Sequence, residues 1–404
     1  MNNTARTARI IAAAAAFSIP ASLANAGADG DMLDLARAVE HASYGYGSLS
    51  PIPDSLKASI HTQFRYMYNQ RDSKSTTLVG PDDDLTIGFV TRRTKFKLSG
   101  NVTEDISAKV TMAFSNSTGA AALEDAVFSW KISDTVSLRG GQFKPALVRE
   151  ENMSSSKQLT VDRSAVNETI NQDFTQGLEL IITEDDWRAF LSFNDGIGAD
   201  NTYFTSATEG DLGFTARGEL RFGDASWKQF GQFTSFRGAN TGLMVGAAFH
   251  HQTMGNTNPS TTPSTDMSIG VLDASYLGDG WNLFAAGTWR TMDSGATSLT
   301  DAGLVLQGGV FVSDNDEFFA RWDVLMPSDS NPIVPGTSGN SDFNTVTVGW
   351  NHYIIPESHA AKFTLEVQHY ADPTTESIVS LRNNLLADST SGQFAITAQM
   401  QLLF

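Results

Sequence analysis

The last twelve residues alternate between apolar and polar side chains. Every second residue from Phe394 to Phe404 is apolar, and the residues between them are mostly Gln, Thr or small. This two-residue period predicts a β-strand with one apolar and one polar face. In a soluble sheet such a terminal strand would leave an unprotected edge. Taken alone, this stretch would also fit a strand of a soluble β-sandwich. In an outer-membrane barrel the last strand pairs with the first, and no edge remains.

The first 26 residues predict a secretory signal peptide. Two arginines precede an apolar run at 10–19, which is too short to span a bilayer as a helix. The run is followed by Ala24-Asn25-Ala26, a small-x-small cleavage site. We therefore expect residues 1–26 to be removed, residues 27–57 to form an N-terminal periplasmic leader, and residues 58–404 to form the barrel.

The composition excludes several classes of protein. No later segment is a continuous apolar run of the length that a transmembrane helix needs. The absence of cysteine excludes disulfides and thiolate chemistry. A formal net charge of −18 argues against a nucleic-acid partner, because phosphate contacts need Lys and Arg. Acidic clusters such as 314–317 are read as solvated turns, or alternatively as sites where divalent cations bridge to lipopolysaccharide.

The alternation recurs along the rest of the chain. We count seventeen candidate strands, one of them at 227–236, between candidates at 212–222 and 242–251. Single-chain bacterial barrels have an even number of strands. The sequence therefore predicts an all-β fold, a transmembrane antiparallel β-barrel of about 16 strands with 18 as the alternative, and one candidate is wrong or one strand is missing.

A row of basic residues follows the polar face of one predicted strand. Phe96 and Leu98 point one way, and the bases between and before them point the other way. A lysine or arginine facing lipid near the midplane costs roughly 2–4 kcal/mol, so the basic face is expected to line the lumen. The bases in this predicted inward register are Arg93, Lys95, Lys97, Lys109 and Lys131.

The segment at about 144–173 is the longest stretch without alternation in the first half of the chain. A loop of this length in a compact domain is usually functional or disordered, and its spaced apolar residues argue against disorder. We expect it to fold into the barrel and narrow it. Its bases are Lys144, Arg149, Lys157 and Arg163. Glu150, Glu151 and Asp162 lie among them, so the bases either attract anions or pair with these acids.

Several short motifs resemble one family. Arg-Arg-Thr-Lys-Phe-Lys-Leu-Ser-Gly at 92–100, Gly-Gln-Phe-Lys-Pro at 141–145 and Asp-Arg-Ser at 162–164 are similar to segments of the porin P family, also called phosphate-selective porins O and P. Phe-Asn-Asp-Gly at 193–196 resembles a turn of that family, and the terminal Phe404 agrees with it. The resemblance implies a sixteen-stranded outer-membrane porin, usually a homotrimer, whose members are named for phosphate.

The sequence and this resemblance predict a channel for passive diffusion of small hydrophilic solutes and ions, with a possible preference for anions or phosphate. Expected partners are small anionic or neutral solutes, outer-membrane lipids and lipopolysaccharide. The alternatives are a structural or adhesive barrel with partner-binding loops, and a barrel enzyme. No nucleophile-elbow or zinc-helix motif occurs, so no catalytic residue, metal or cofactor is expected.

Overall fold

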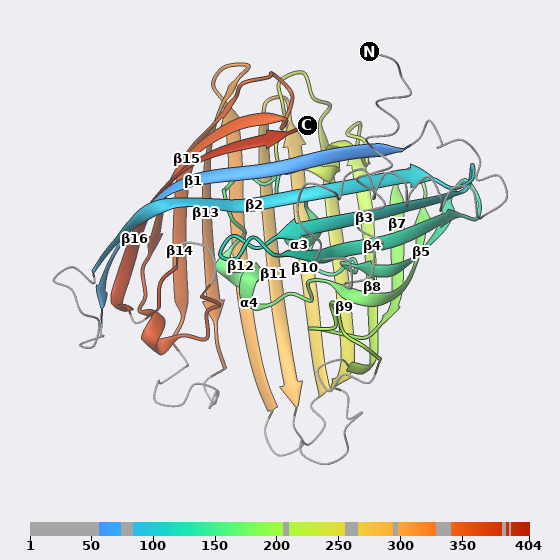
Figure 1. Ribbon diagram of the computed structural model, residues 1–404, viewed down its shortest axis with the longest axis horizontal. Coiled ribbons are helices and arrows are strands. Elements are labelled where there is room, and N and C mark those ends of the chain that lie inside the picture. Colours follow the sequence, from blue (N-terminus) through green and yellow to red (C-terminus); the bar gives the residue numbers. More distant parts are fainter. Residues whose placement is uncertain are drawn as a thin grey trace, which may run out of the picture. The chain divides into compact units, whose positions relative to one another are not determined.

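A computed structural model describes residues 56–73, 84–204, 210–254, 266–293, 298–328, 341–381, 385–387 and 389–404. Within these ranges sixteen strands form one closed antiparallel barrel (Figure 1), so the prediction of 16 strands is confirmed and the alternative of 18 is wrong. The predicted signal peptide (1–26) and all but the last two residues of the predicted leader (27–57) lie outside the described residues.

Each strand pairs with its neighbours in the sequence, and β1 also pairs with β16. The strands are β1 (Lys57–Ser73), β2 (Leu85–Asn101), β3 (Ile106–Phe114), β4 (Ala121–Lys131), β5 (Val136–Phe143), β6 (Thr175–Thr183), β7 (Trp187–Asn194), β8 (Gly210–Gly223), β9 (Gly242–Met254), β10 (Asp266–Gly278), β11 (Trp281–Asp293), β12 (Ser298–Phe311), β13 (Asp316–Met326), β14 (Phe343–Tyr353), β15 (Ala361–Tyr370) and β16 (Ser389–Leu403). The short helices are α3 (Arg149–Asn152), α4 (Ala165–Thr169), η2 (Gln229–Gly231) and η3 (Thr374–Glu376).

The seam between β1 and β16 closes the barrel. The Ile60 amide donates to the Phe404 carbonyl at 2.6 Å, and the Phe404 amide donates to the Ile60 carbonyl at 3.0 Å. On β16 the side chains of Phe394, Met400 and Leu402 are exposed on the outer face, whereas the glutamines that alternate with them are buried. The prediction that the terminal strand is two-faced and pairs with the first strand is therefore confirmed.

The same alternation holds on strands far from the seam. On β13, Phe318 and Trp322 are exposed on the outer face, while Glu317, Arg321 and Asp323 are buried on the inner face. Exposed large apolar side chains recur on most strands and give the barrel the apolar outer surface that contacts lipid. No helix among the described residues is long and apolar enough to cross a membrane.

The predicted strand at 227–236 is wrong. These residues lie in the link between β8 and β9, which contains η2, and Phe230 and Phe233 are buried there. The aromatic residues Trp227, Phe230, Phe233 and Phe236 recur every third residue, whereas a two-faced strand needs a period of two. Removing this candidate leaves the sixteen observed strands.

Two β-bulges direct additional charged side chains inward. Arg92 has no partner in the β1–β2 register, and Glu124 has none in the β3–β4 register. A bulge inserts one unpaired residue and re-aims the side chains beside it. As a result both Arg92 and Arg93 approach the same carboxylate inside the barrel, and both Glu124 and Asp125 line the same internal cavity.

The register predicts which engineered cysteines will react. Cysteines on the outer face should resist a membrane-impermeant thiol reagent when the protein is in lipid, as in the variants Phe128→Cys, Trp130→Cys and Phe394→Cys. Lys97→Cys and Lys109→Cys border an internal cavity and should react. The chain has no natural cysteine, so labelling can be read by mass spectrometry without background. Equal labelling of both sets would contradict the register.

Candidate channel constriction

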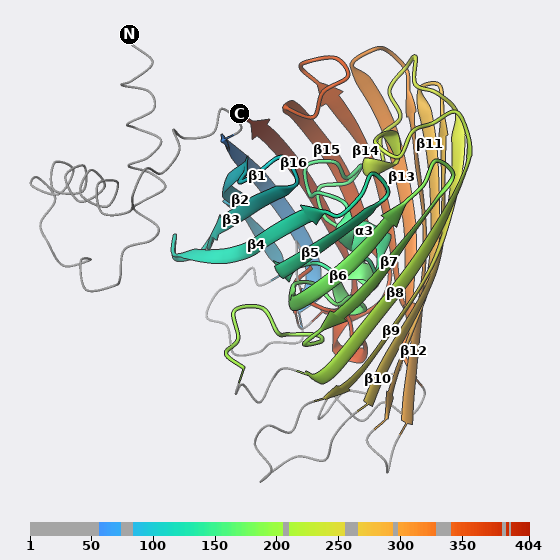
Figure 2. The same cartoon turned by 90° about the vertical axis from the view of Figure 1, so that its right-hand side faces the viewer.

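The link between β5 and β6 lies inside the barrel: Figure 1 labels its helices α3 and α4, and Figure 2 shows α3 within the ring of strands. Its side chains Leu147, Leu159 and Ile170 are almost fully buried. They belong to the same apolar cluster as Ile269 and Phe284 of the inner wall. Burying these side chains on the apolar part of the wall favours the inward conformation, since about 1.5–3 kcal/mol is gained for each large apolar side chain buried. We call residues 144–174 the inner loop.

Polar side chains of the wall bind the backbone of the inner loop from several directions. Asn351 donates to the Leu159 carbonyl at 3.0 Å, and Glu366 accepts from the Val161 amide at 2.9 Å. Across the seam, Gln401 donates to the Ser156 carbonyl at 3.0 Å. These buried hydrogen bonds satisfy loop groups that would otherwise be costly to remove from water, so they fix the position of the inner loop.

Asp162 attaches the inner loop to three arginines of the wall. Arg65 binds its carboxylate with the two terminal guanidinium nitrogens, at 2.5 and 2.9 Å, while Arg93 approaches to 3.2 Å and Arg92 to 3.7 Å. Burial alone would raise the pKa of the Asp162 carboxyl, but the three arginines outweigh burial and hold its pKa well below the usual range. We call these four residues the arginine clamp.

The space that the inner loop leaves open lies beside β1–β5. One cavity of about 440 Å³ extends from Ser59 and Leu403 to the loop, and another of about 220 Å³ borders Arg92 and Phe114. The residues that line both cavities are Lys95, Glu124, Lys144, Glu151, Arg163 and Phe174. These six residues, which we call the shared ring, lie between the two cavities.

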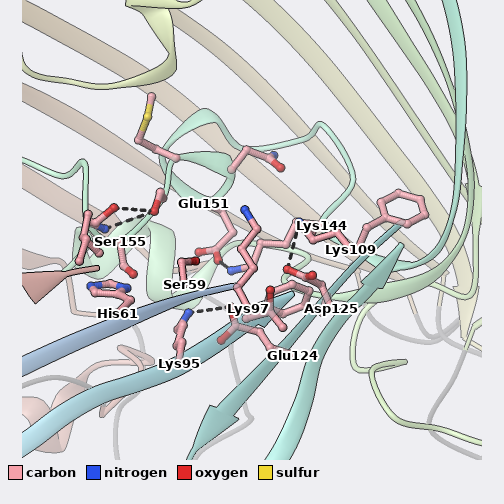
Figure 3. Close-up of a pocket in the computed structure, with 18 of the residues that line it drawn as sticks. Ser59, His61, Lys95, Lys97, Lys109, Glu124, Asp125, Lys144, Glu151 and Ser155 are labelled. Carbon is pink, nitrogen blue, oxygen red and sulfur yellow. Dashed lines mark hydrogen bonds and ion pairs between the residues drawn. The ribbon is translucent and has the colours of Figure 1, made fainter. Parts of the chain in front are cut away.

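Basic side chains outnumber acidic ones in the larger cavity. Its bases are Lys95, Lys97, Lys109, Arg139, Lys144 and Arg163, and its carboxylates are Glu124, Asp125 and Glu151. Figure 3 shows several of these lysines and carboxylates converging from β2, β3, β4 and the inner loop on one space. The local charge is therefore positive, although the whole chain carries −18. A narrow cleft with charge of one sign raises the local concentration of counter-ions.

Most of these bases are paired with carboxylates. Lys95 Nζ lies 2.6 Å from Glu124, and Lys109 Nζ lies 3.2 Å from Asp125. Lys144 contacts Glu151, which also lies 3.4 Å from Arg163. Lys97 forms no ion pair with another described residue and is exposed to the cavity. The acids thus weaken the positive field of the cavity without cancelling it.

Lys144 also lies over an aromatic ring. Its Nζ is 4.4 Å from the centre of the Phe174 ring and 2.9 Å from Asp173. Burial, together with the positive charge of Arg163, lowers the pKa of Lys144 to about 8, and Asp173 opposes this shift. The side chain is therefore mostly protonated at neutral pH and contributes to the positive charge of the shared ring.

The structure brings five of the nine predicted bases together in the larger cavity: Lys95, Lys97, Lys109, Lys144 and Arg163. Arg93 borders the smaller cavity, but its charge is engaged in the arginine clamp. Lys131 lies on the inward register at the exposed end of β4, where it binds Asp134 at 2.6 Å instead of lining either cavity. Glu124 of the shared ring lies seven residues earlier on the same strand, and at roughly 3.3 Å per residue this separates Lys131 from the ring by about 20 Å.

Arg149 and Lys157 line neither cavity. Arg149 is buried, and its guanidinium donates to Ser275 Oγ at 2.9 Å and to the Phe230 carbonyl at 2.5 Å. The Lys157 carbonyl accepts from the Phe233 amide at 3.2 Å. Both residues therefore attach the inner loop to the protein interior, a role that charge and spacing in the sequence do not reveal.

Sequence reasoning missed Arg65, Arg92 and Arg139. Arg65 alternates with the exposed Phe64 and Tyr66, so the pattern of the first strand carried a usable signal for an inward arginine. Arg92 gave no such signal, because its direction depends on the bulge. Arg139 alternates with an apolar neighbour on β5, lines the larger cavity and binds Glu179 at 2.6 Å.

The comparisons with known proteins agree with this architecture. The anion-selective porin from Comamonas acidovorans superposes with a TM-score of 0.60 at 10% identity, covering 87% of this chain and 99% of that one. The in-vitro folded OmpT of Vibrio cholerae in its trimer form gives 0.54 at 13% identity, covering 86% and 100%. The Salmonella typhi OmpF complex with daunomycin gives 0.57 at 9% identity, covering 86% and 97%. At these identities the similarity concerns the fold.

No curated protein matches the chain in sequence. The model of the family described as phosphate-selective porin O and P, however, matches residues 62–404, which is most of the chain and nearly the whole barrel. The chain therefore belongs to the phosphate-selective porin O and P family and is a channel-forming β-barrel of the bacterial outer membrane.

Proposed function

We propose that this porin lets small hydrophilic solutes diffuse past the shared ring and that its passage prefers anions. The observation that carries the proposal is the excess of bases over carboxylates in the larger cavity, in a chain that is acidic as a whole. Because the field in a narrow passage depends on nearby charges, the local excess outweighs the distant acids. On this proposal the barrel acts as a channel and not as an enzyme or an adhesive scaffold.

We further propose that the field attracts anions generally and that the passage does not hold a dedicated phosphate site. A phosphate site needs several basic donors that are free to converge on one anion. Here Lys95, Lys109 and Lys144 each have a carboxylate partner. Phosphate would compete with these partners, whereas neutral solutes would pass through the same space without such competition.

Reversal potentials in planar bilayers test the anion preference. In a salt gradient at low concentration, the purified protein should give a potential of the sign expected for anion selectivity. Raising the salt towards 1 M should reduce this reversal potential, because the Debye length shortens from about 10 Å at 0.1 M to about 3 Å. Cation selectivity at low salt would overturn the proposal. Block of chloride current by micromolar phosphate would show that a dedicated site exists.

We also propose a homotrimer in contact with outer-membrane lipids and lipopolysaccharide. Support comes from the solved OmpT, which is described in a trimer form, and from the broad apolar outer surface available for packing against lipid or another copy. The molar mass of the protein in detergent, measured by light scattering, tests this assignment, and a monomeric mass would contradict it.

A further inference from the structure

The link between β8 and β9, residues 224–241, differs from other turns at its end of the barrel. The turn between β10 and β11 has only two residues, Asp279 and Gly280. Figure 2 shows the link, in yellow-green, at the end of the barrel where β16 finishes. Short turns face the periplasm in bacterial outer-membrane barrels. We call residues 224–241 the inner turn.

The inner turn packs into the barrel. Phe230, Phe233 and Thr234 are almost fully buried. The Phe233 ring lies 4.7 Å from that of Phe284 on β11, between ring centres. These contacts place the rings of Phe230 and Phe233 against the inner wall, inside the barrel beside β9–β11.

Phe236 extends the same packing to the other side of the turn. Its ring lies 5.1 Å from Tyr353, 5.4 Å from Phe311 and 5.6 Å from His359. Gln232 also reaches His359, with its side-chain oxygen 3.1 Å from Nε2. The inner turn is therefore held by wall residues from β12, β14 and the link before β15.

The inner turn also binds the inner loop directly. The Phe233 amide donates to the Lys157 carbonyl, and the Arg149 guanidinium donates to the Phe230 carbonyl. Arg149 lies 5.7 Å from the centre of the Phe233 ring as well. Because the two segments enter from opposite ends of the barrel, these contacts join them in the interior.

A buried hydrogen-bond network makes a second connection. Tyr353 donates its hydroxyl to Glu317 at 2.7 Å and accepts from Thr234 of the inner turn at 2.9 Å. Asn351 donates to Glu317 at 3.3 Å and to the Leu159 carbonyl of the inner loop at 3.0 Å. Loss of the Thr234 hydroxyl would therefore disturb Tyr353 and Glu317, which are connected through Asn351 to the inner loop.

We propose that the inner turn is the periplasmic support of the inner loop and closes the lumen beside β9–β15, so that solutes pass only along β1–β5. The two internal cavities described above both lie beside β1–β5, and no residue of the inner turn lines either of them. The inner turn thus determines the width and position of the passage. The shared ring determines its charge.

Removing the aromatic anchors tests the closure. The triple variant Phe230→Ser, Phe233→Ser, Phe236→Ser should release the inner turn towards the periplasm. Single-channel conductance should roughly double, because current scales with open cross-section, and anion selectivity should fall, because a second path avoids the basic ring. Lys228→Ser, on the exposed surface of the same turn, is the matched control and should leave both quantities unchanged. Heat-modifiable gel migration reports whether the barrel is closed.

The hydroxyl pair provides a second test that preserves side-chain shape. Thr234→Val and Tyr353→Phe should each increase transitions between conductance substates, and the double variant should add little to either single variant, because both remove the same link. A folded triple variant with unchanged conductance and selectivity would overturn the proposal. If the triple variant does not fold, unchanged open-channel traces in both single variants would overturn it. The sign of the wild-type reversal potential tests the anion proposal separately.

Discussion

Replacing Lys95, Lys97 and Lys109 together with glutamine should bring the reversal potential of the channel close to zero. The larger cavity would then contain three bases and three carboxylates instead of six and three. Exposed charges act over about 10 Å at 0.1 M salt, so this local balance determines which ions enter. Glutamine keeps most of the side-chain volume, and conductance for neutral solutes should change little. Reversal potentials in a salt gradient at low concentration measure the effect.

Lys131→Gln is the control for this experiment. It also removes a positive charge from the inward register of the barrel wall, but Lys131 is exposed, lines neither cavity and is bound to Asp134. Its effect on selectivity should be small. Arg93 is left unchanged in the triple variant because it belongs to the arginine clamp. If the triple variant keeps the wild-type reversal potential, the larger cavity does not set selectivity.

Asp162→Ala should detach the inner loop while the barrel stays closed. The substitution leaves Arg65 and Arg93 buried without their carboxylate, and breaking a buried ion pair from one side costs about 3–5 kcal/mol. Release of the loop relieves this cost by exposing the arginines to water. We expect higher conductance with unstable current levels, and faster cleavage of the loop by trypsin after Arg163. Single-channel recording and limited proteolysis measure the two effects.

Two further variants separate the clamp from a general loss of charge. Asp134→Ala removes a carboxylate of an exposed ion pair, which contributes little to stability, and should leave wild-type currents. Adding Arg65→Met to Asp162→Ala removes the charge with the closest contacts to the lost carboxylate, and should partly restore stable currents. Wild-type currents and proteolysis in Asp162→Ala would show that the clamp does not hold the loop.

The strands could be predicted because each one separates lipid from the interior, which imposes a period of two on the side chains. The period identified the terminal strand and the basic face of β2 that carries Lys95 and Lys97. The two-residue period did not apply at 227–236, where aromatic side chains are buried in a link that is not a strand. It also failed at Arg92 and Glu124, because a bulge depends on pairing with another strand and leaves no local pattern.

Part of the candidate site could be predicted from the sequence for the same reason. Lys109 could be placed by alternation, but the direction of a loop side chain depends on what the loop packs against. Arg149 and Lys144 are both basic residues of the inner loop, and the sequence does not distinguish their roles. The structure buries Arg149 against Phe230 and places Lys144 in the shared ring. The carboxylate partners of the bases also come from other elements, so the degree of charge cancellation could not be determined beforehand.

The seam has a consequence for how the molecule assembles. Gln63 of β1 and Gln401 of β16 are 338 residues apart in sequence, yet they hydrogen-bond to each other at 2.8 Å. Both also donate to the inner loop, at Ser155 and Ser156. The loop therefore connects the two strands of the seam from inside the barrel. Its binding site forms only after β1 and β16, the strands farthest apart in the sequence, have paired. We expect pore narrowing and ring closure to occur as one late folding step, preceded by a curved sheet with two open edges that must be shielded from other chains.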